Sequence, residues 1–541
     1  MSVEPRPLLA FEPATIGKRE KKPGYSQKIS GPGVKRQANR LNPQFKNLLA
    51  AFESKRAMLG EGTPGEVDPS LVVVFDVAGR VQDFYKAIQK VDGLEFLAEL
   101  IEDQIGPNED FSDAKDNSKK LDNSLYLVMS NVKAIDELLK LFEEWRVNPQ
   151  ASFKYGFAKF KDLFQQLKAI RRWGPEDRVR ETGLLERWRR DLELAGDFIC
   201  TVRIEVELWY RNDAHKRSEA ETTVEKIVIN SGGKIINRSH IAGIKYHALL
   251  IEIPIQQVKL VLDRGVEAIK ILTTDDVMFV SPFEPMSIAT QDAEPVKNVV
   301  LESIKKVEGK PRVALLDGMP FQNHDALQGR LLIDDPDNID ARYPLESRKH
   351  GTAMASLIIH GDLNQSSSTP LDRPLYVRPI MESQEGFREG EYSERVISDY
   401  LFPDLLHRAV KRIVEGDNGR DAVAPSVRII NLSLGDPVRA LTHRISPLGR
   451  LLDWLAVHYN LLFIVSAGNH NAEFTIPAIN ARTVQSARSA ATRAAFDRSI
   501  LRGILPPGDA INALTVGATH SDGYSVSDMP DTVWDITYSD S

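Results

Sequence analysis

Three polar residues in the second half of the chain stand where predicted elements of secondary structure begin or end: Asp317, His350 and Asn469. They offer a carboxylate, an imidazole and a carboxamide that can donate a hydrogen bond. Taken singly, each has an ordinary structural explanation. Asp-Gly and Ala-Gly-Asn are common in turns, and a histidine can simply lie at a helix end. Their order along the chain, and the elements that carry them, must decide between structure and chemistry.

Short apolar runs lead into these polar positions. The run RVALL is followed by Asp317, RIINL by Ser-Leu-Gly, and LLFIV by Ser-Ala-Gly and then Asn469. Apolar runs without charge are typical of strands in a parallel sheet that is covered on both faces. His350 instead precedes Gly-Thr and a helix-forming apolar run. Because sites in open α/β sheets gather at the carboxyl ends of the strands, we expect these residues at one edge.

In the order strand-Asp-Gly, His-Gly-Thr-helix, strand-Ser-Leu-Gly and strand-Ser-Ala-Gly-Asn, the chain resembles the subtilisin-like serine peptidases (subtilases). The resemblance covers roughly residues 300 to 541. It implies that His350 is the general base and later the general acid, and that Asp317 orients and stabilises its imidazole. Asn469 would donate to the oxyanion of the tetrahedral intermediate. The implied substrate-binding residues are Ser433, Leu434, Gly435 and Gly468, with the first three forming an edge that pairs with the substrate backbone.

One part of the family pattern is absent from the printed sequence. The family's nucleophilic serine lies in a Gly-Thr-Ser-x-Ala-x-Pro turn that begins a buried helix, and no such string occurs here. The segment Ile511–Thr519 resembles the family strand that follows the Asn motif, and the serine comes later in the family. We therefore expect a C-terminally truncated sequence, with the serine beyond residue 541. The alternative is a degenerate subtilase that has lost its nucleophile.

Composition places the chain among ordinary globular proteins. It has 541 residues, of which 42% are hydrophobic and 27% charged, and a net charge of −7, so bulk charge favours neither nucleic acid nor membrane as a partner. Cys200 is the one cysteine, which excludes an intramolecular disulfide. The N-terminal stretch has no apolar run of signal-peptide length, so we expect a cytoplasmic protein. No cofactor or metal is expected, and the acidic segment 334–340 favours an exposed loop over a calcium loop.

The chain divides into five predicted segments. Residues 1–65 form a basic, largely disordered arm with one amphipathic helix at 43–59, and residues 66–150 a small α/β module for which a ferredoxin-like order is one reading. Residues 151–197 form a helical linker. Residues 198–290 follow the order βαββαβ of a ferredoxin-like module. Residues 291–541 form the subtilisin-like domain, a doubly wound parallel sheet of the α/β class.

Some finer assignments belong to these segments. Helical spacing predicts one helix from Phe160 through Ile170, and Ala268–Leu272 is predicted as the last strand of its module. The segment Glu382–Glu394 is predicted as a surface loop. The module at 198–290 resembles a subtilase propeptide by position and topology, and a permanent structural domain is the alternative.

The resemblance implies a serine endopeptidase that hydrolyses polypeptide substrates through an Asp-His-Ser triad and an acyl-enzyme. The alternative is a catalytically inactive subtilase-like protein with a binding or regulatory role. Some bacterial subtilases with long N-terminal regions are paired with an ATPase in defence against phage, so an ATPase partner is an expectation from architecture alone. A membrane or nucleic-acid partner is not expected.

Overall fold

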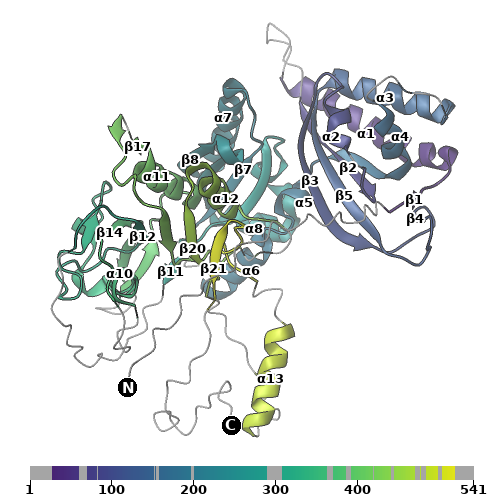
Figure 1. Ribbon diagram of the computed structural model, residues 1–541. Coiled ribbons are helices and arrows are strands. Elements are labelled where there is room, and N and C mark those ends of the chain that lie inside the picture. Colours follow the sequence, from purple (N-terminus) through teal and green to yellow (C-terminus); the bar gives the residue numbers. More distant parts are fainter. Residues whose placement is uncertain are drawn as a thin grey trace. The chain divides into compact units, whose positions relative to one another are not determined.

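The computed structural model describes most of the chain between residues 27 and 517. The described residues are 27–59, 70–81, 83–150, 153, 157–195, 200–288, 307–361, 369–385, 392–417, 419–439, 441, 444–469, 476, 483–497 and 503–517. The chain forms two compact units, residues 1–173 and 174–541, and each is described by itself. Figure 1 labels their elements.

The first unit is an antiparallel sheet of order β3-β5-β2-β6 with helices packed on one face. Phe45, Phe142, Phe160 and Phe164 meet in the core between the helices and the sheet. The elements are β1 (Ile29–Ser30), α1 (Val34–Leu59), β2 (Leu71–Ala78), α2 (Phe84–Ile88), β3 (Leu94–Ile105), β4 (Ser112–Asp113), β5 (Leu121–Ser130), α3 (Val132–Val147), α4 (Ala158–Gln166) and β6 (Leu167–Arg172).

Two expectations for this unit were wrong. The helix predicted at 43–59 begins at Val34 and packs into the core, so this part of the chain is a folded element and not a disordered arm. The helix predicted from Phe160 to Ile170 ends at Gln166, and the following residues form β6 in the region assigned to a helical linker. A strand with a bulge buries Leu167 and Ile170 as well as a helix would. The segment forms a strand because it can pair with the open edge of β2.

The second unit begins with a four-stranded antiparallel sheet of order β10-β7-β9-β8. Its helices α7 and α8 cover one face. The segment predicted as the strand Ala268–Leu272 forms short helical turns that bury Leu272, and the last strand follows them. The elements are α5 (Pro175–Val179), α6 (Leu184–Ala195), β7 (Thr201–Leu208), α7 (Ala214–Asn230), β8 (Lys234–Ile241), η2 (Ala242–Ile244), β9 (Tyr246–Pro254), α8 (Ile255–Arg264), η3 (Val266–Ala268), α9 (Lys270–Thr273) and β10 (Val277–Pro282).

The second sheet of this unit is parallel throughout, in the order β13-β14-β12-β19-β20-β21. The chain starts at the central strand β12, moves to one side for β13 and β14, and then to the other side for β19 to β21. This reversal makes the carboxyl end of β12 a topological switch point, where open α/β sheets commonly bind their ligands. The strands are β12 (Val313–Asp317), β13 (Leu331–Ile333), β14 (Leu375–Pro379), β19 (Ile429–Leu432), β20 (Leu462–Ser466) and β21 (Ala513–Val516).

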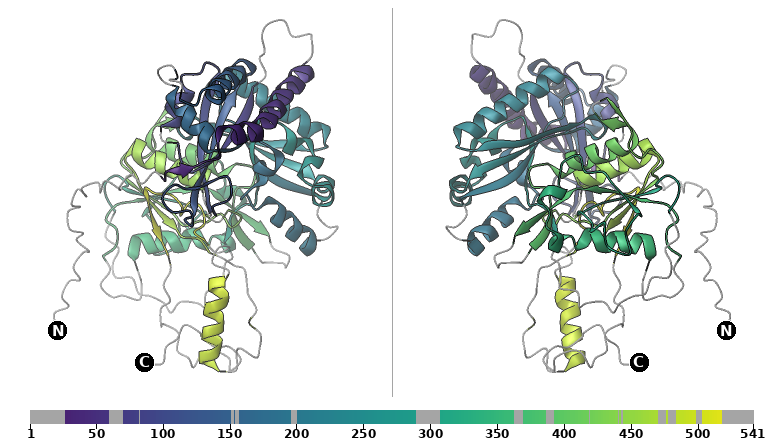
Figure 2. Two further views of the ribbon diagram at one scale, coloured as in Figure 1. Left: turned by 90° about the vertical axis from the view of Figure 1, so that its right-hand side faces the viewer. Right: turned by 90° about the vertical axis from the view of Figure 1, so that its left-hand side faces the viewer.

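Helices lie on both faces of the parallel sheet. Ala314 and Leu316 of β12 pack with α11 (Phe402–Val414) and α12 (Pro447–Tyr459), whereas Leu315 packs with α10 (His350–His360) on the opposite face. Figure 2 shows α10 and the α11–α12 pair on opposite sides of the strands. The antiparallel sheet shares this core, because Tyr246 and Leu250 of β9 pack into the cluster that holds α11 and α12.

A small third sheet, β11-β16-β15, takes up both ends of the segment Glu382–Glu394, which was predicted as a surface loop, and residues 386–391 lie outside the described ranges. Met381 and Val396 are buried and hold β15 and β16 on the body of the unit, which local polarity did not reveal. The remaining elements are β11 (Ser287–Ile288), η4 (Asp340–Arg342), η5 (Leu345–Ser347), β15 (Met381–Glu385), β16 (Tyr392–Val396), β17 (Gly416–Asp417), β18 (Arg420–Asp421) and α13 (Val484–Asp497). Within the described residues, no helix has the length and apolar character needed to cross a membrane.

Candidate active site

Asp317 and His350 lie in contact at the carboxyl end of β12. Asp317 is the last residue of that strand and His350 is the first residue of α10. The Nδ1 atom of His350 lies 2.7 Å from Oδ1 of Asp317, as the sequence predicted. The Asp317 side chain is fully buried, and that of His350 is 21% exposed. Since Asp317 holds Nδ1, the Nε2 atom is the one left to accept a proton from another group.

Two glycines allow this close approach. A Cβ atom on Gly351 would overlap the carbonyl group of Gly318, so the first turn of α10 rests directly on the turn after β12. The backbone N–H of Gly318 also donates to Asp317 Oδ1, at 2.6 Å. The Asp-Gly and His-Gly pairs of the sequence therefore have a packing reason as well as a chemical one.

The surroundings of His350 favour its charged form. Burial alone lowers the pKa of this imidazole, but the hydrogen bond and the negative charge of Asp317, with the charge of Glu394, outweigh burial and raise the pKa. A group whose protonated form is stabilised in this way is a stronger base. The arrangement suits an imidazole that takes up a proton and holds it beside a fixed carboxylate.

Glu394 was missed by the sequence analysis, which placed it at the end of a surface loop. It lies on β16, is fully buried, and its Oε2 accepts a hydrogen bond from the backbone N–H of His350 at 2.7 Å. Its other carboxylate oxygen accepts from the hydroxyl of Tyr343. The signal in the sequence is weak: Glu394 and Val396 are two apart, the spacing of one face of a strand, and both are buried.

The residues expected to bind substrate follow β19 and β20. Leu434 is buried and anchors its loop in the core, and the hydroxyl of Ser433 donates to the side chain of Asn431 at 3.1 Å. The backbones of Gly435 and Gly468 touch: a Cβ on Gly435 would lie 3.0 Å from the Gly468 Cα. Gly468 also has a positive φ of 94°, which favours glycine. The structure thus brings these two loops together.

Asn469 is exposed at the carboxyl end of β20. Among the described residues, no hydrogen bond joins it to Asp317 or His350. Asn469 therefore lies at the same edge of the parallel sheet as the Asp317–His350 pair.

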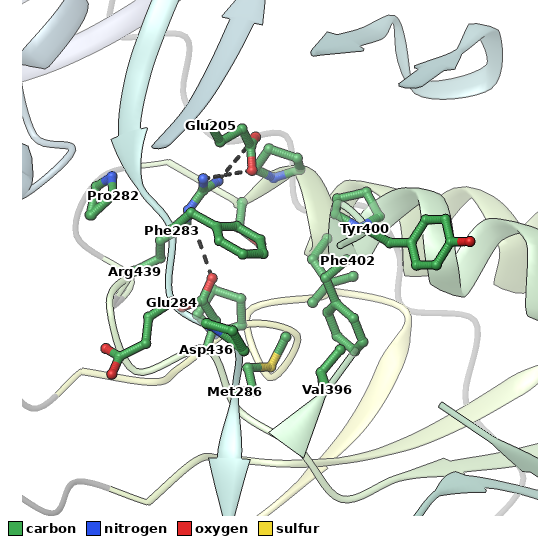
Figure 3. A pocket seen from close by; sticks show the side chains of 16 residues that line it. Glu205, Pro282, Phe283, Glu284, Met286, Val396, Tyr400, Phe402, Asp436 and Arg439 are labelled. Atoms are coloured by element: carbon green, nitrogen blue, oxygen red, sulfur yellow. Dashed lines mark hydrogen bonds and ion pairs between the residues drawn. The ribbon is translucent and has the colours of Figure 1, made fainter. Parts of the chain in front are cut away.

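A separate pocket lies where the antiparallel sheet meets the loop after β19. In Figure 3, Arg439 points between Glu205 and Asp436. Its guanidinium lies 2.7 Å from Glu205 and 3.7 Å from Asp436, and the hydroxyl of Tyr246 donates to Glu205 at 2.9 Å. Burial raises the pKa of Asp436 to about 6 although Arg439 opposes this. These contacts join the two sheets and suit a structural role.

Aspartates of the acidic segment 334–340 form ion pairs with arginine side chains. Asp334 accepts hydrogen bonds from Arg412 at 2.8 and 2.9 Å and from Tyr376 at 2.6 Å, and Asp337 pairs with Arg378. In the described ranges, no group of three or more His, Cys, Asp or Glu side chains is arranged to hold a metal ion.

Comparison with protein-family models matches residues 309–538 to the subtilase family. This range includes Asp317, His350, Asn469 and the loops after β19 and β20. A search of curated proteins finds no match to the chain.

Proposed function

Because residues 309–538 match the subtilase family, whose members are serine-type peptidases, we propose that this chain belongs to a serine endopeptidase that cleaves polypeptides through an acyl-enzyme. One observation carries the proposal. A buried carboxylate holds Nδ1 of a partly exposed imidazole at 2.7 Å, at the switch point of a parallel sheet. We also propose that the parallel sheet has the doubly wound arrangement expected for residues 291–541.

In this proposal His350 accepts the proton of a serine hydroxyl through Nε2 while that oxygen attacks the substrate carbonyl carbon. Asp317 fixes the imidazole tautomer and stabilises the imidazolium. Asn469 donates to the oxyanion, and His350 then returns the proton to the leaving amine. The backbone of Ser433 to Gly435 pairs with an extended substrate.

The serine itself is proposed to lie outside the printed residues, on a helix that covers part of the parallel sheet. Three apolar side chains on the α10 face of this sheet are exposed: Leu462 by 42%, Leu514 by 54% and Val516 by 51%. The strand register places them on the same face as buried Leu315. Parallel sheets are normally covered on both faces, so a further apolar helix beside α10 would complete the fold.

We also propose that the β7–β10 sheet is a ferredoxin-like module equivalent to a propeptide. The order of its elements along the chain, β7-α7-β8-β9-α8-β10, and the order of the strands in the sheet, β10-β7-β9-β8, support this. Ion pairs from Glu205 to Arg439 and from Glu207 to Arg450 fasten it to the peptidase part. N-terminal sequencing of purified active protein decides whether the module is cleaved off or retained.

The decisive experiment uses the full open reading frame. We expect it to encode Gly-Thr-Ser-x-Ala-x-Pro after residue 541 and to label with a serine-directed phosphonate. Asn469→Ala should lower the single-turnover rate of peptide cleavage by about 10²–10³-fold with little change in KM, because the oxyanion exists only in the transition state. An open reading frame without the serine motif, or peptide binding without turnover, would identify a binding protein instead.

A further inference from the structure

Glu394 closes the amino end of the helix that carries His350. The carboxylate comes from β16, on a different sheet from Asp317, yet it accepts the backbone N–H of His350 at 2.7 Å. Tyr343 donates its hydroxyl to the same carboxylate. The packing leaves no spare room, since a Cβ on Gly318 would lie 2.5 Å from Glu394 and 2.6 Å from the Tyr343 hydroxyl.

The helix needs such a partner. The first N–H groups of an α-helix have no acceptor within the helix and are usually capped by Ser, Thr, Asp or Asn. Here the N-cap residue is Lys349, whose side chain has no acceptor. A carboxylate at this position also interacts favourably with the positive end of the helix dipole. Glu394 therefore supplies from a distant strand what the local sequence lacks.

We propose that Glu394, held by Tyr343, is a positioning residue for the catalytic base: it fixes the first turn of α10 and thereby the place of the His350 imidazole against Asp317. The inference rests on the proposed peptidase function and deepens it. Asp317 orients the ring from its Nδ1 atom, while Glu394 orients the backbone from which the ring projects. Neither contact alone fixes both the ring and its backbone.

Charge reinforces this geometry. The charged groups that act on His350 are Asp317 from β12 and Glu394 from β16, and Tyr343 from the segment before α10 contacts Glu394. Burial and the Glu394 charge raise the pKa of Tyr343, so it stays a neutral donor. Burial also raises the pKa of Glu394, against the two hydrogen bonds that it accepts. The charge of Glu394 is one of the causes that raise the pKa of His350.

Two substitutions separate geometry from charge in the full-length protein. Glu394→Gln retains one oxygen for the His350 N–H and a group that reaches Tyr343, but removes the charge. We expect the acid limb of kcat/KM to move about one pH unit lower, with the plateau within about tenfold of wild type. Glu394→Ala also removes the contact, and should lower the plateau kcat by about 10–100-fold. The matched control is Glu382→Gln on neighbouring β15, because the Glu382 carboxylate pairs with Arg395. This variant should leave both the acid limb and the plateau unchanged.

An unchanged limb in Glu394→Gln together with a wild-type plateau in Glu394→Ala would overturn the proposal. Losses that follow only the folded fraction would also overturn it. If the alanine variant fails to fold, the glutamine variant and Tyr343→Phe decide, and unchanged kcat in Tyr343→Phe would count against it.

The pKa of His350 can also be measured without catalytic turnover, which separates this inference from the peptidase proposal. Nuclear magnetic resonance titration of ring-labelled histidine, assigned with His350→Gln, reports the His350 pKa in the 541-residue chain. Glu394→Gln should lower that pKa, and Glu382→Gln should not. A lowered pKa in a protein without activity would retain the role of Glu394 and reject the peptidase, whereas an unchanged pKa would reject the contribution of the Glu394 charge.

Discussion

Replacing Asp317 by Asn tests the central contact of the site with almost no change in shape. The carboxylate lies 2.7 Å from Nδ1 of His350. Two unit charges at this separation attract by about 6 kcal/mol at an effective dielectric constant of 20. If that attraction stabilises the imidazolium of the transition state, its loss slows the reaction by about 10⁴-fold. The amide also favours the wrong imidazole tautomer, which acts in the same direction.

The assay is single-turnover cleavage by the full-length protein and its Asp317→Asn variant. Asp404→Asn on α11 is the matched control, since Asp404 is also largely buried but pairs with Arg408. We expect about 10⁴-fold loss for Asp317→Asn and a rate within about threefold for the control. Equal losses in both variants, or less than tenfold loss in Asp317→Asn, would refute the assigned role.

The same substitution has a signature in stability. The His350 pKa is raised in the folded chain, so the folded state binds a proton more tightly than the unfolded state does. This stabilisation is fully present below the unfolded pKa of about 6.5 and is lost as pH rises through the folded pKa. Urea unfolding at pH 5.5 and 8.5 should show a smaller pH dependence in Asp317→Asn. An unchanged pH dependence would mean that Asp317 does not set the His350 pKa.

Three further substitutions follow from the packing and the charges. Burial raises the pKa of Asp436 to about 6, so stability should fall as pH rises from about 4 to 6, and Asp436→Asn should be up to about 3 kcal/mol more stable than wild type at pH 8 in urea and equal at pH 4. Gly351→Ala should cost about 1–3 kcal/mol and reduce kcat, because its Cβ overlaps the turn after β12; equal melting and activity would contradict that packing. Leu514→Asp should leave the melting of the 541-residue chain unchanged within about 0.5 kcal/mol but destabilise the full-length protein by more than about 2 kcal/mol, and equal effects would argue against a covering helix.

Most of the parallel sheet could be predicted because its apolar strands are specified by their own sequence, whereas the short edge strand β13 was not predicted. The runs before Asp317 and Asn469 are apolar and short, and their strands begin and end within one residue of the predicted bounds. The Asp317–His350 contact could be predicted for a different reason. The resemblance to the subtilases implied it, and the glycines of the two motifs are what allow β12 and α10 to touch.

The rest depends on partners that are distant in the chain. Glu394 is buried because β16 pairs with β11 and β15, and its polar neighbours give no sign of this. Leu167 and Ile170 fit helical spacing, yet the open edge of β2 turns them into a strand. In both cases a hydrogen-bonded edge elsewhere in the fold decides the conformation, and a local pattern contains no information about that edge.

The order of the parallel strands has a consequence for how the chain folds. The strand that ends in Asp317 comes first along the sequence but lies in the middle of the sheet, between β14 and β19. Each of these pairings closes a long loop that contains a helix, so the conformational entropy is lost before the contacts are gained, and such topologies fold slowly. During synthesis, β12 leaves the ribosome long before either neighbour. Until those neighbours are synthesised, the apolar residues of β12 lack their native partners, and a chain in this state is prone to aggregate.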